Sequence, residues 1–337
     1  MDTSTSKVLI EIVVRKTIRD IKESPERSTR NIVDMALQFS KGRFQKQFFS
    51  MLQDKLQYEH SAYYGLVRDA VEHVDTEHLV TFGMNLGYNS CTVGAETIRR
   101  NEKKLQCNIP WTVLMQVDSE TFAARRESYQ KVIQEGTELG IFSWMLFAGS
   151  KPAEVLPLIG GFPDCAFFLC CGPKDITSEF LDMISAYRNL MIVVRCDDGT
   201  DEACKMLRSA EQLYSIYCPY SEEDVPEVRS GDLFSEMEQL HPAFSVLLAR
   251  RDCPADTRQE VSDLVAAARA KQEYQTMLWE LDSDNRMVDH VISDGACSIY
   301  FDCEGNLCQY GDSAEPSGNL FANSLKEIFQ QAFPKRK

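Results

Sequence analysis

Three short apolar segments between residues 141 and 199 constrain the fold more than any other part of the chain. "IFSWMLFAGSKP", "CAFFLCCGPKD" and "LMIVVRCDDGTD" follow one another at near-equal spacing, and each breaks off abruptly into Gly, Pro, Ser, Lys or Asp. A segment with helical periodicity separates each from the next. Strands that are buried on both faces, as in a parallel sheet, have this pattern because nothing forces polar residues to alternate with apolar ones.

The same rhythm continues on both sides of this stretch. "IPWTVLMQVD" (109–118) indicates a first strand, and "YSIYCPY", "FSVLLAR" and "YQTMLWELD" indicate later ones, each after a helical segment. Six or seven strand–helix units in one direction predict an α/β fold with a partial parallel (β/α)6-type TIM-like barrel. A doubly wound sheet is the alternative, although no GxGxxG follows any of these strands.

The two ends of the chain differ from this pattern. Residues 7–105 have helical periodicity throughout, which predicts an all-α N-terminal region. Near the other end, "CSIYFDCEGNLCQY" predicts a β-hairpin that turns at Glu304–Asn306, and "GNLFANSLKEIFQQAF" predicts a helix capped by Asn323 or Ser324. We therefore expect three parts: a helical region at 1–107, a barrel at 108–283 and a small C-terminal hairpin and helix at 284–337.

Charge and cysteine usage restrict the partners and the compartment. The net charge of −15 argues against nucleic acid or an anionic membrane surface as the main partner, since both require a basic face. The N-terminus lacks the basic-then-apolar order of a signal peptide, so we expect a cytoplasmic protein. The twelve cysteines include no CxxC and no zinc-like spacing. We expect those near the strands, Cys196 and Cys218 among them, to be small core residues rather than a disulfide framework.

The loops after the three central strands are the best candidates for a binding site. In α/β folds ligands sit at the carboxyl ends of parallel strands, so these loops should form the rim of a site. Charges of both signs at this rim could clamp a carboxylate, a phosphate or a peptide backbone, or they could simply be solvated. The candidates for ligand contact are Gly149, Ser150, Lys151, Gly172, Lys174, Arg195, Asp197 and Asp198.

Several of these segments together resemble a known family. "CNIPWTVLMQVDS", "QEGTELGI" and "FAGSKP" come first, and "EGNLCQY" and "GNLFANSLKEIF" follow near the end. In this order and spacing, over most of residues 8–330, the chain resembles the radical S-adenosylmethionine (radical SAM) family with a SPASM-like C-terminal segment. The resemblance implies a barrel that binds a four-iron cluster through a CxxxCxxC loop after the first strand, with S-adenosylmethionine as cosubstrate.

The chain departs from this family at the residues that carry the chemistry. The loop at 116–123 contains no cysteine, and Lys151 stands where the family's GGEP motif has an acid, so that a cation would face the cosubstrate's ammonium group. Cys308 matches a cysteine in the family's C-terminal segment, whereas Val291 stands where the family has another cysteine upstream of it. The resemblance therefore implies a degenerate pseudoenzyme with no cofactor and no metal. We expect it to bind a protein or peptide partner, such as an active radical SAM paralogue. Assembly of this chain into a homo-oligomer is an alternative.

Two other functions remain open at this point. One is an iron–sulfur enzyme that uses S-adenosylmethionine with an unconventional cluster on the C-terminal cysteines Cys297, Cys303 and Cys308. The other is a small anionic-ligand-binding protein in which Lys151 and Arg195 hold the anion. Cys170 and Cys171 with Cys196 could form a remodelled thiol site, but adjacent strand residues point to opposite faces, which favours core packing.

Overall fold

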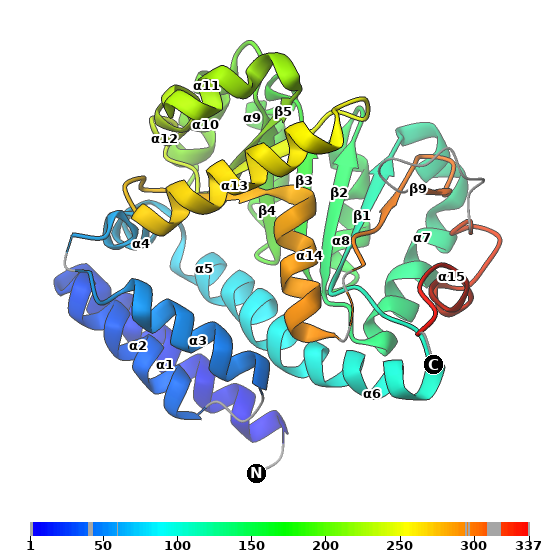
Figure 1. Ribbon diagram of the computed structural model, residues 1–337, viewed down its shortest axis with the longest axis horizontal. Helices are drawn as coiled ribbons and strands as arrows, with labels where there is room; N and C mark the ends of the chain where they lie inside the picture. Colours follow the sequence, from blue (N-terminus) through cyan, green and yellow to red (C-terminus); the bar gives the residue numbers. More distant parts are fainter. Residues whose placement is uncertain are drawn as a thin grey trace.

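The computed structural model has a curled nine-stranded sheet at its centre (Figure 1). It describes residues 3–39, 43–58, 60–293, 295, 297–308 and 318–335. The strand order is β7-β6-β5-β4-β3-β2-β1-β8-β9, and β1 to β7 are parallel. This confirms the predicted partial TIM-like barrel, with seven strands in its parallel series. These strands are β1 (Thr112–Val117), β2 (Ser143–Ala148), β3 (Ala166–Cys171), β4 (Leu190–Arg195), β5 (Tyr214–Tyr220), β6 (Phe244–Ala249) and β7 (Met277–Glu280).

Both faces of the parallel strands are covered, which is why their sequences do not alternate between apolar and polar residues. On the outer face Val113, Leu146 and Leu169 are fully buried beneath the crossover helices. The opposite, concave face belongs to a separate apolar cluster that lines the inside of the curled sheet. Its buried members are Leu114, Met145, Cys170, Val193, Val246 and Leu281.

The crossover helices follow the strands in the predicted alternation and cover the outer face (Figure 1). The first of them ends where Gly140 adopts a left-handed φ of 108°, a conformation that favours glycine and stops a helix. The helices are α7 (Ser119–Leu139), α8 (Leu156–Gly160), α9 (Ser178–Ile184), α10 (Thr200–Ser209), α11 (Val225–Ser230), α12 (Asp232–Glu238) and α13 (Ala255–Lys271).

The N-terminal region is helical, as its periodicity predicts. Ile18 and Ile21 pack against Val71, Val80 and Met84 in a core of their own. The helices are α1 (Thr3–Glu23), α2 (Pro25–Phe39), α3 (Arg43–Lys55), α4 (Ala62–His73), α5 (Thr76–Gly83), the π-helix η1 (Met84–Gly94) and α6 (Ala95–Leu105).

The segment α5–η1–α6 joins this region to the amino-terminal end of the barrel. The Phe82 ring of α5 lies 5.4 Å from the Phe168 ring of β3, edge to face. From η1, the buried Asn85 donates hydrogen bonds to the backbone oxygens of Pro163 (2.7 Å) and Cys165 (2.9 Å). These contacts fix the helical region beneath the strands and leave the carboxyl ends of the strands at the opposite end.

Helix α14 (Leu281–Ile292) connects the two edges of the curled sheet. It starts directly after β7, with Leu281 in the concave cluster, and lies in front of the strands in Figure 1. Toward its end, the buried Asp289 accepts a hydrogen bond of 2.8 Å from the backbone N–H of Trp111, just before β1. The helix therefore crosses from the β7 edge to the β1 edge of the half-barrel.

The C-terminal segment forms the predicted hairpin and helix. Strand β8 (Tyr300–Phe301) pairs parallel with β1 and antiparallel with β9 (Leu307–Cys308). Gly305 takes a φ of 84° at the turn between them. Helix α15 (Leu325–Ala332) starts at the N-cap Ser324, which forms a capping box with Glu327.

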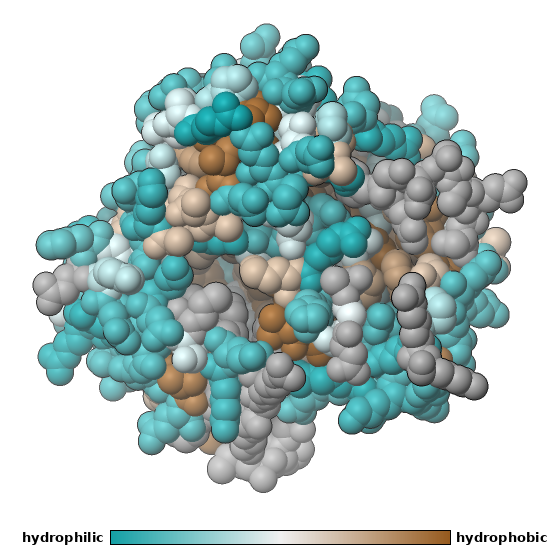
Figure 2. All heavy atoms as spheres, viewed as in Figure 1, coloured by the Kyte–Doolittle hydropathy of each residue, from teal (hydrophilic) through white to brown (hydrophobic). Residues whose placement is uncertain are grey.

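The described residues contain no helix that is long and apolar enough to cross a membrane. Figure 2 shows one face of the molecule, which is mainly hydrophilic with apolar side chains in small groups. This surface agrees with the strongly acidic composition.

Candidate functional site

The loop after β2 lies at the mouth of the half-barrel, at the carboxyl end of the strands. The N–H of Gly149 donates to the carbonyl of Val117 at the end of β1 (3.1 Å). The hydroxyl oxygens of Ser150 and Ser119 lie 3.3 Å apart. Lys151 has a left-handed φ of 50°, and its side chain is 72% exposed, 3.7 Å from a Glu154 carboxylate oxygen. The lysine thus points to solvent and to an acid rather than into the barrel.

The loops after β3 and β4 are each held by local hydrogen bonds. The N–H of Gly172 donates to Asp175 (2.9 Å). The Thr200 hydroxyl at the start of α10 donates to the carbonyl of Arg195 (2.9 Å) and accepts from the N–H of Asp197 (2.9 Å). Lys174, Arg195, Asp197 and Asp198 are exposed.

The structure places all eight predicted rim residues at the carboxyl ends of β2, β3 and β4, with Arg195 as the last residue of β4 and the others in the three loops that follow these strands. Within the described ranges, no hydrogen bond or ion pair joins Lys151, Lys174 and Arg195 to one another. Their role as ligand contacts stays a prediction.

Aromatic side chains dominate the concave face behind this rim. The Phe147 ring of β2 lies 5.8 Å from the Tyr217 ring of β5 and 6.4 Å from the Tyr300 ring of β8, edge to face in both cases. Strands β2 and β5 are not neighbours in the sheet, so the first pair meets across its curved interior. Six aromatic residues on this face are partly buried: Phe147, Phe168, Tyr217, Phe244, Trp279 and Tyr300.

The two tyrosines are kept neutral by their surroundings. Burial raises the pKa of Tyr300 to about 12, although the Arg251 guanidinium opposes the shift. Burial also raises the pKa of Tyr217, and Arg195 opposes that shift. As a neutral phenol, Tyr300 donates a 2.6 Å hydrogen bond to the side-chain carbonyl of Gln116. The site can therefore offer apolar ring surface, phenol hydroxyls and the exposed Arg195 guanidinium to a ligand.

The C-terminal hairpin forms part of the mouth. Pairing of β8 with β1 brings Tyr300 into the concave face. Arg251, in the loop after β6, lies 3.4 Å from the Sγ of Cys308 in β9. Since β6 and β9 are far apart in the strand order, this contact reaches across the open side of the half-barrel.

The residues after β1 do not fit a four-iron cluster. Strand β1 ends at Val117 and α7 begins at Ser119, so Asp118 is the whole connection. Its carboxylate caps the helix by accepting from the N–H groups of Glu120 (3.1 Å) and Thr121 (2.9 Å). A hydrogen bond with the Thr121 side chain, followed by these backbone bonds, lowers its pKa. Residues 112–139 contain no cysteine. There is neither a loop nor a thiolate at the place where the CxxxCxxC motif would stand.

Cys170 and Cys171 are both buried, as predicted for core residues. Cys170 belongs to the concave cluster, and Cys171 belongs to the core beneath the crossover helices. Burial raises the pKa of both thiols, so both remain protonated. The two side chains face opposite sides of the sheet and cannot share a ligand.

The expectation that Cys196 and Cys218 are free is wrong. They form a disulfide with their Cα atoms 4.9 Å apart. The physical reason is the strand register: Arg195 pairs with Tyr217, so the next residue of each strand also lies side by side. The other ten cysteines, all within the described residues, are free, so the prediction is wrong for this one pair, and the chain has no network of disulfides.

The candidate metal ligands of the tail lie in different surroundings. Cys297 is buried, and its N–H lies 3.3 Å from a carboxylate oxygen of Asp289. Burial and this carboxylate raise its pKa. Cys303 and Cys308 are partly exposed in the hairpin. In the part of the chain that the structure describes, no three His, Cys, Asp or Glu side chains are grouped so that they could hold a metal ion.

Comparison with known proteins gives a structural match only. No protein-family model matches the sequence, and no curated protein matches it. The chain is similar to SuiB of Streptococcus suis bound to S-adenosylmethionine, with 9% identity and a TM-score of 0.51 over 70% of this chain and 67% of SuiB. A second SuiB structure gives 9% identity and a TM-score of 0.49 over 90% and 79% of the two chains.

The first match supports a radical SAM-like fold. SuiB binds the cosubstrate of the family that the sequence resembles. At 9% identity the similarity concerns the fold, and it assigns no chemistry to this chain.

Sequence reasoning missed the aromatic part of the site. Phe147, Tyr217 and Tyr300 were not among the candidates, because an apolar strand gives no sign of which alternate residues face inward. A usable signal was present for one of them: Phe147 lies close to the carboxyl end of a predicted strand, where inward-facing residues line the mouth.

Proposed function

We propose that this chain is a non-catalytic, radical-SAM-like protein that binds a protein or peptide partner at the mouth of its half-barrel. The observation that carries the proposal is the connection from β1 to α7, which consists of Asp118 alone. The four-iron cluster of this family is bound by three cysteine thiolates, and this connection contains no cysteine. The fold is kept without the loop on which radical SAM chemistry depends.

The mouth has the surface chemistry of a recognition site for polypeptide. Partly exposed aromatic rings can bury apolar side chains of a partner, and aromatic residues are enriched where binding energy is concentrated. The exposed rim carries cations at Lys151, Lys174 and Arg195 and carboxylates at Asp197 and Asp198. Charges of both signs around an apolar centre suit a peptide with an apolar segment and flanking charges, such as a segment of an active radical SAM paralogue.

The first test is the metal and cosubstrate content of the purified protein. After anaerobic reconstitution with iron and sulfide and desalting, we expect no stoichiometric iron and no thiolate-to-iron absorption band. We expect titration with S-adenosylmethionine to give no binding heat. Near four irons per chain, retained after desalting, would refute the loss of cluster chemistry and would favour the cluster on the C-terminal cysteines.

The second test concerns the partner. An active radical SAM paralogue from the same genome is titrated into this protein, and the dissociation constant is measured by biolayer interferometry. Replacement of a central aromatic anchor, Phe147→Ala, should weaken binding at least tenfold, which corresponds to roughly 1.4 kcal/mol. The exposed substitution Arg229→Ala, on α11, where the side chain pairs with Glu260 of α13, is the control. Equal affinities of the two variants would place the interface elsewhere.

A further inference from the structure

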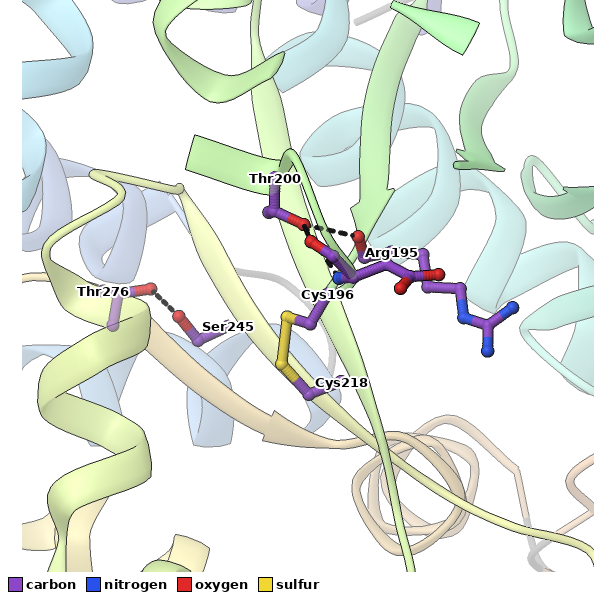
Figure 3. Close-up of a disulfide and its surroundings, with 7 residues drawn as sticks. Arg195, Cys196, Thr200, Cys218, Ser245 and Thr276 are labelled. Atoms are coloured by element: carbon purple, nitrogen blue, oxygen red, sulfur yellow. Dashed lines mark hydrogen bonds between the residues drawn. A yellow bond between two sulfur atoms is a disulfide. The ribbon is translucent and has the colours of Figure 1, made fainter. Parts of the chain in front are cut away.

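The disulfide between Cys196 and Cys218 lies near the carboxyl ends of β4 and β5, on the outer face of the sheet that the crossover helices cover. Cys196 directly follows β4, and Cys218 is in β5, its neighbour in the sheet. Figure 3 shows the bond spanning the two strands, with the Arg195 side chain pointing away from it. All twelve cysteines lie in described parts of the chain, and this pair alone is oxidised.

The bond fixes the spacing of two residues that face the site. Arg195 and Tyr217 are register partners one position before the cysteines, so their side chains point to the concave side. The N–H of Cys196 donates to the carbonyl of Tyr217 (2.8 Å), which extends the ladder to the end of β4. A covalent link at this point holds Arg195 beside the Tyr217 ring. Opening it would leave only backbone hydrogen bonds between the two strand ends.

The two cysteines differ in their exposure to solvent. Cys196 is partly exposed at the start of the rim loop, whereas Cys218 is 7% exposed beneath it. A small thiol can therefore approach the Cys196 side of the bond. Strand β3, the neighbour of β4, carries Cys170 and Cys171, whose burial raises their thiol pKa values and disfavours exchange with them.

We propose that Cys196 and Cys218 form a reversible thiol–disulfide exchange site that couples the redox state of small thiols to the geometry of the mouth. The reactants are dithiols in one direction and low-molecular-weight disulfides in the other. A dithiol thiolate attacks the Sγ of Cys196, the protein disulfide breaks, and Cys218 leaves as a thiolate that takes up a proton. The second thiol of the reductant then displaces Cys196 from the mixed disulfide. Two electrons and two protons pass to the protein, and the reductant becomes a cyclic disulfide.

This inference is independent of the partner proposal, because it requires no ligand at the mouth. The test uses the full-length protein without denaturant. It is equilibrated with dithiothreitol or with oxidised glutathione, quenched with iodoacetamide and analysed by intact mass and peptide mapping. In the reduced sample we expect two additional alkylated cysteines, mapped to Cys196 and Cys218, and both modifications should be absent after reoxidation. Cys303→Ser, which removes another partly exposed cysteine, should leave this response unchanged.

Hydrogen exchange tests the coupling to the mouth. In the reduced protein, the amides of residues 195–200 should exchange faster than in the oxidised protein, whereas those of α7 should not change. A disulfide that resists reduction until denaturant is added would overturn the proposal, because the pair would then be a structural cross-link. Identical exchange in both redox states would overturn the coupling, even with a reducible pair.

Discussion

A buried ion pair between α13 and α14 gives the sharpest prediction on stability. Arg269 donates to the two carboxylate oxygens of Asp284 at 2.7 and 2.8 Å, and the side chains are 17% and 6% exposed. Arg269 also donates to the carbonyl of Leu278 and lies 5.7 Å from the Trp279 ring on the concave face. The pair therefore holds both the last parallel strand and the start of the helix that crosses the open side.

Replacing Arg269 by Met keeps the apolar stem and removes the charge. Asp284 would keep the hydrogen bond from the Glu280 N–H (2.8 Å), but its charge would be buried without a counter-ion. Removing one partner of a buried pair typically costs about 3–5 kcal/mol. We expect Arg269→Met to lower the free energy of unfolding by about 4 kcal/mol. Urea unfolding followed by circular dichroism, with linear extrapolation to water, measures this difference.

An exposed pair on the same helix provides the control. Arg229 of α11 contacts Glu260 of α13, and these side chains are 61% and 41% exposed. Because solvent screens such pairs, Arg229→Met should cost at most about 1 kcal/mol. Adding Asp284→Leu to Arg269→Met should recover part of the loss, since no unpaired charge then remains. Equal costs for the two Arg→Met variants would refute the reasoning.

Three further predictions concern single residues of the helices. Burial lowers the pKa of His78, whose Nε2 contacts the carbonyl of Leu190, so the neutral ring is favoured in the folded state. The unfolded chain binds the proton more tightly, so the free energy of unfolding should fall as the pH drops below about 6.5. His78→Gln should weaken this pH dependence, which is measured by comparing urea unfolding at pH 7.5 and at pH 5.5. In α7, a Cβ on Gly136 would lie 2.3 Å from the Trp144 ring. Gly136→Ala should therefore lower the free energy of unfolding by about 1–3 kcal/mol, which a lower urea midpoint would show. Gly83→Ala, where nothing lies within 4 Å of the added Cβ, should instead gain up to about 1 kcal/mol.

The order of elements was predictable because it is written in local patterns. Each parallel strand is a short apolar run that ends in turn residues, and a long helix such as α7 has its own stop signal at Gly140. The hairpin at Gly305 and the capping box at Ser324 are equally local. Helix α14 was missed, although Leu281, Val288 and Ile292 repeat at helical spacing, because its acidic residues resemble a loop between two domains.

The features that depend on strand register could not be read from the sequence. Cys196 and Cys218 are 22 residues apart, and nothing in the intervening helix states which residue of β5 lies beside the end of β4. The meeting of Phe147 with Tyr217 depends in the same way on the curvature of the whole sheet. Curvature and register arise from packing between distant segments, so the position of the loops could be predicted from the sequence, whereas the aromatic contacts inside the sheet could not.

The way in which the β1 side of the mouth is filled bears on the proposed recognition role. In this chain that side is covered by β8, whose Tyr300 hydroxyl donates to Gln116 of β1, and by the contact of Arg251 with Cys308. Aromatic packing and side-chain hydrogen bonds therefore fill this side of the mouth. An interior filled in this way accepts a partner's side chains at its rim more readily than a cofactor at depth, which is the physical basis for proposing recognition rather than catalysis.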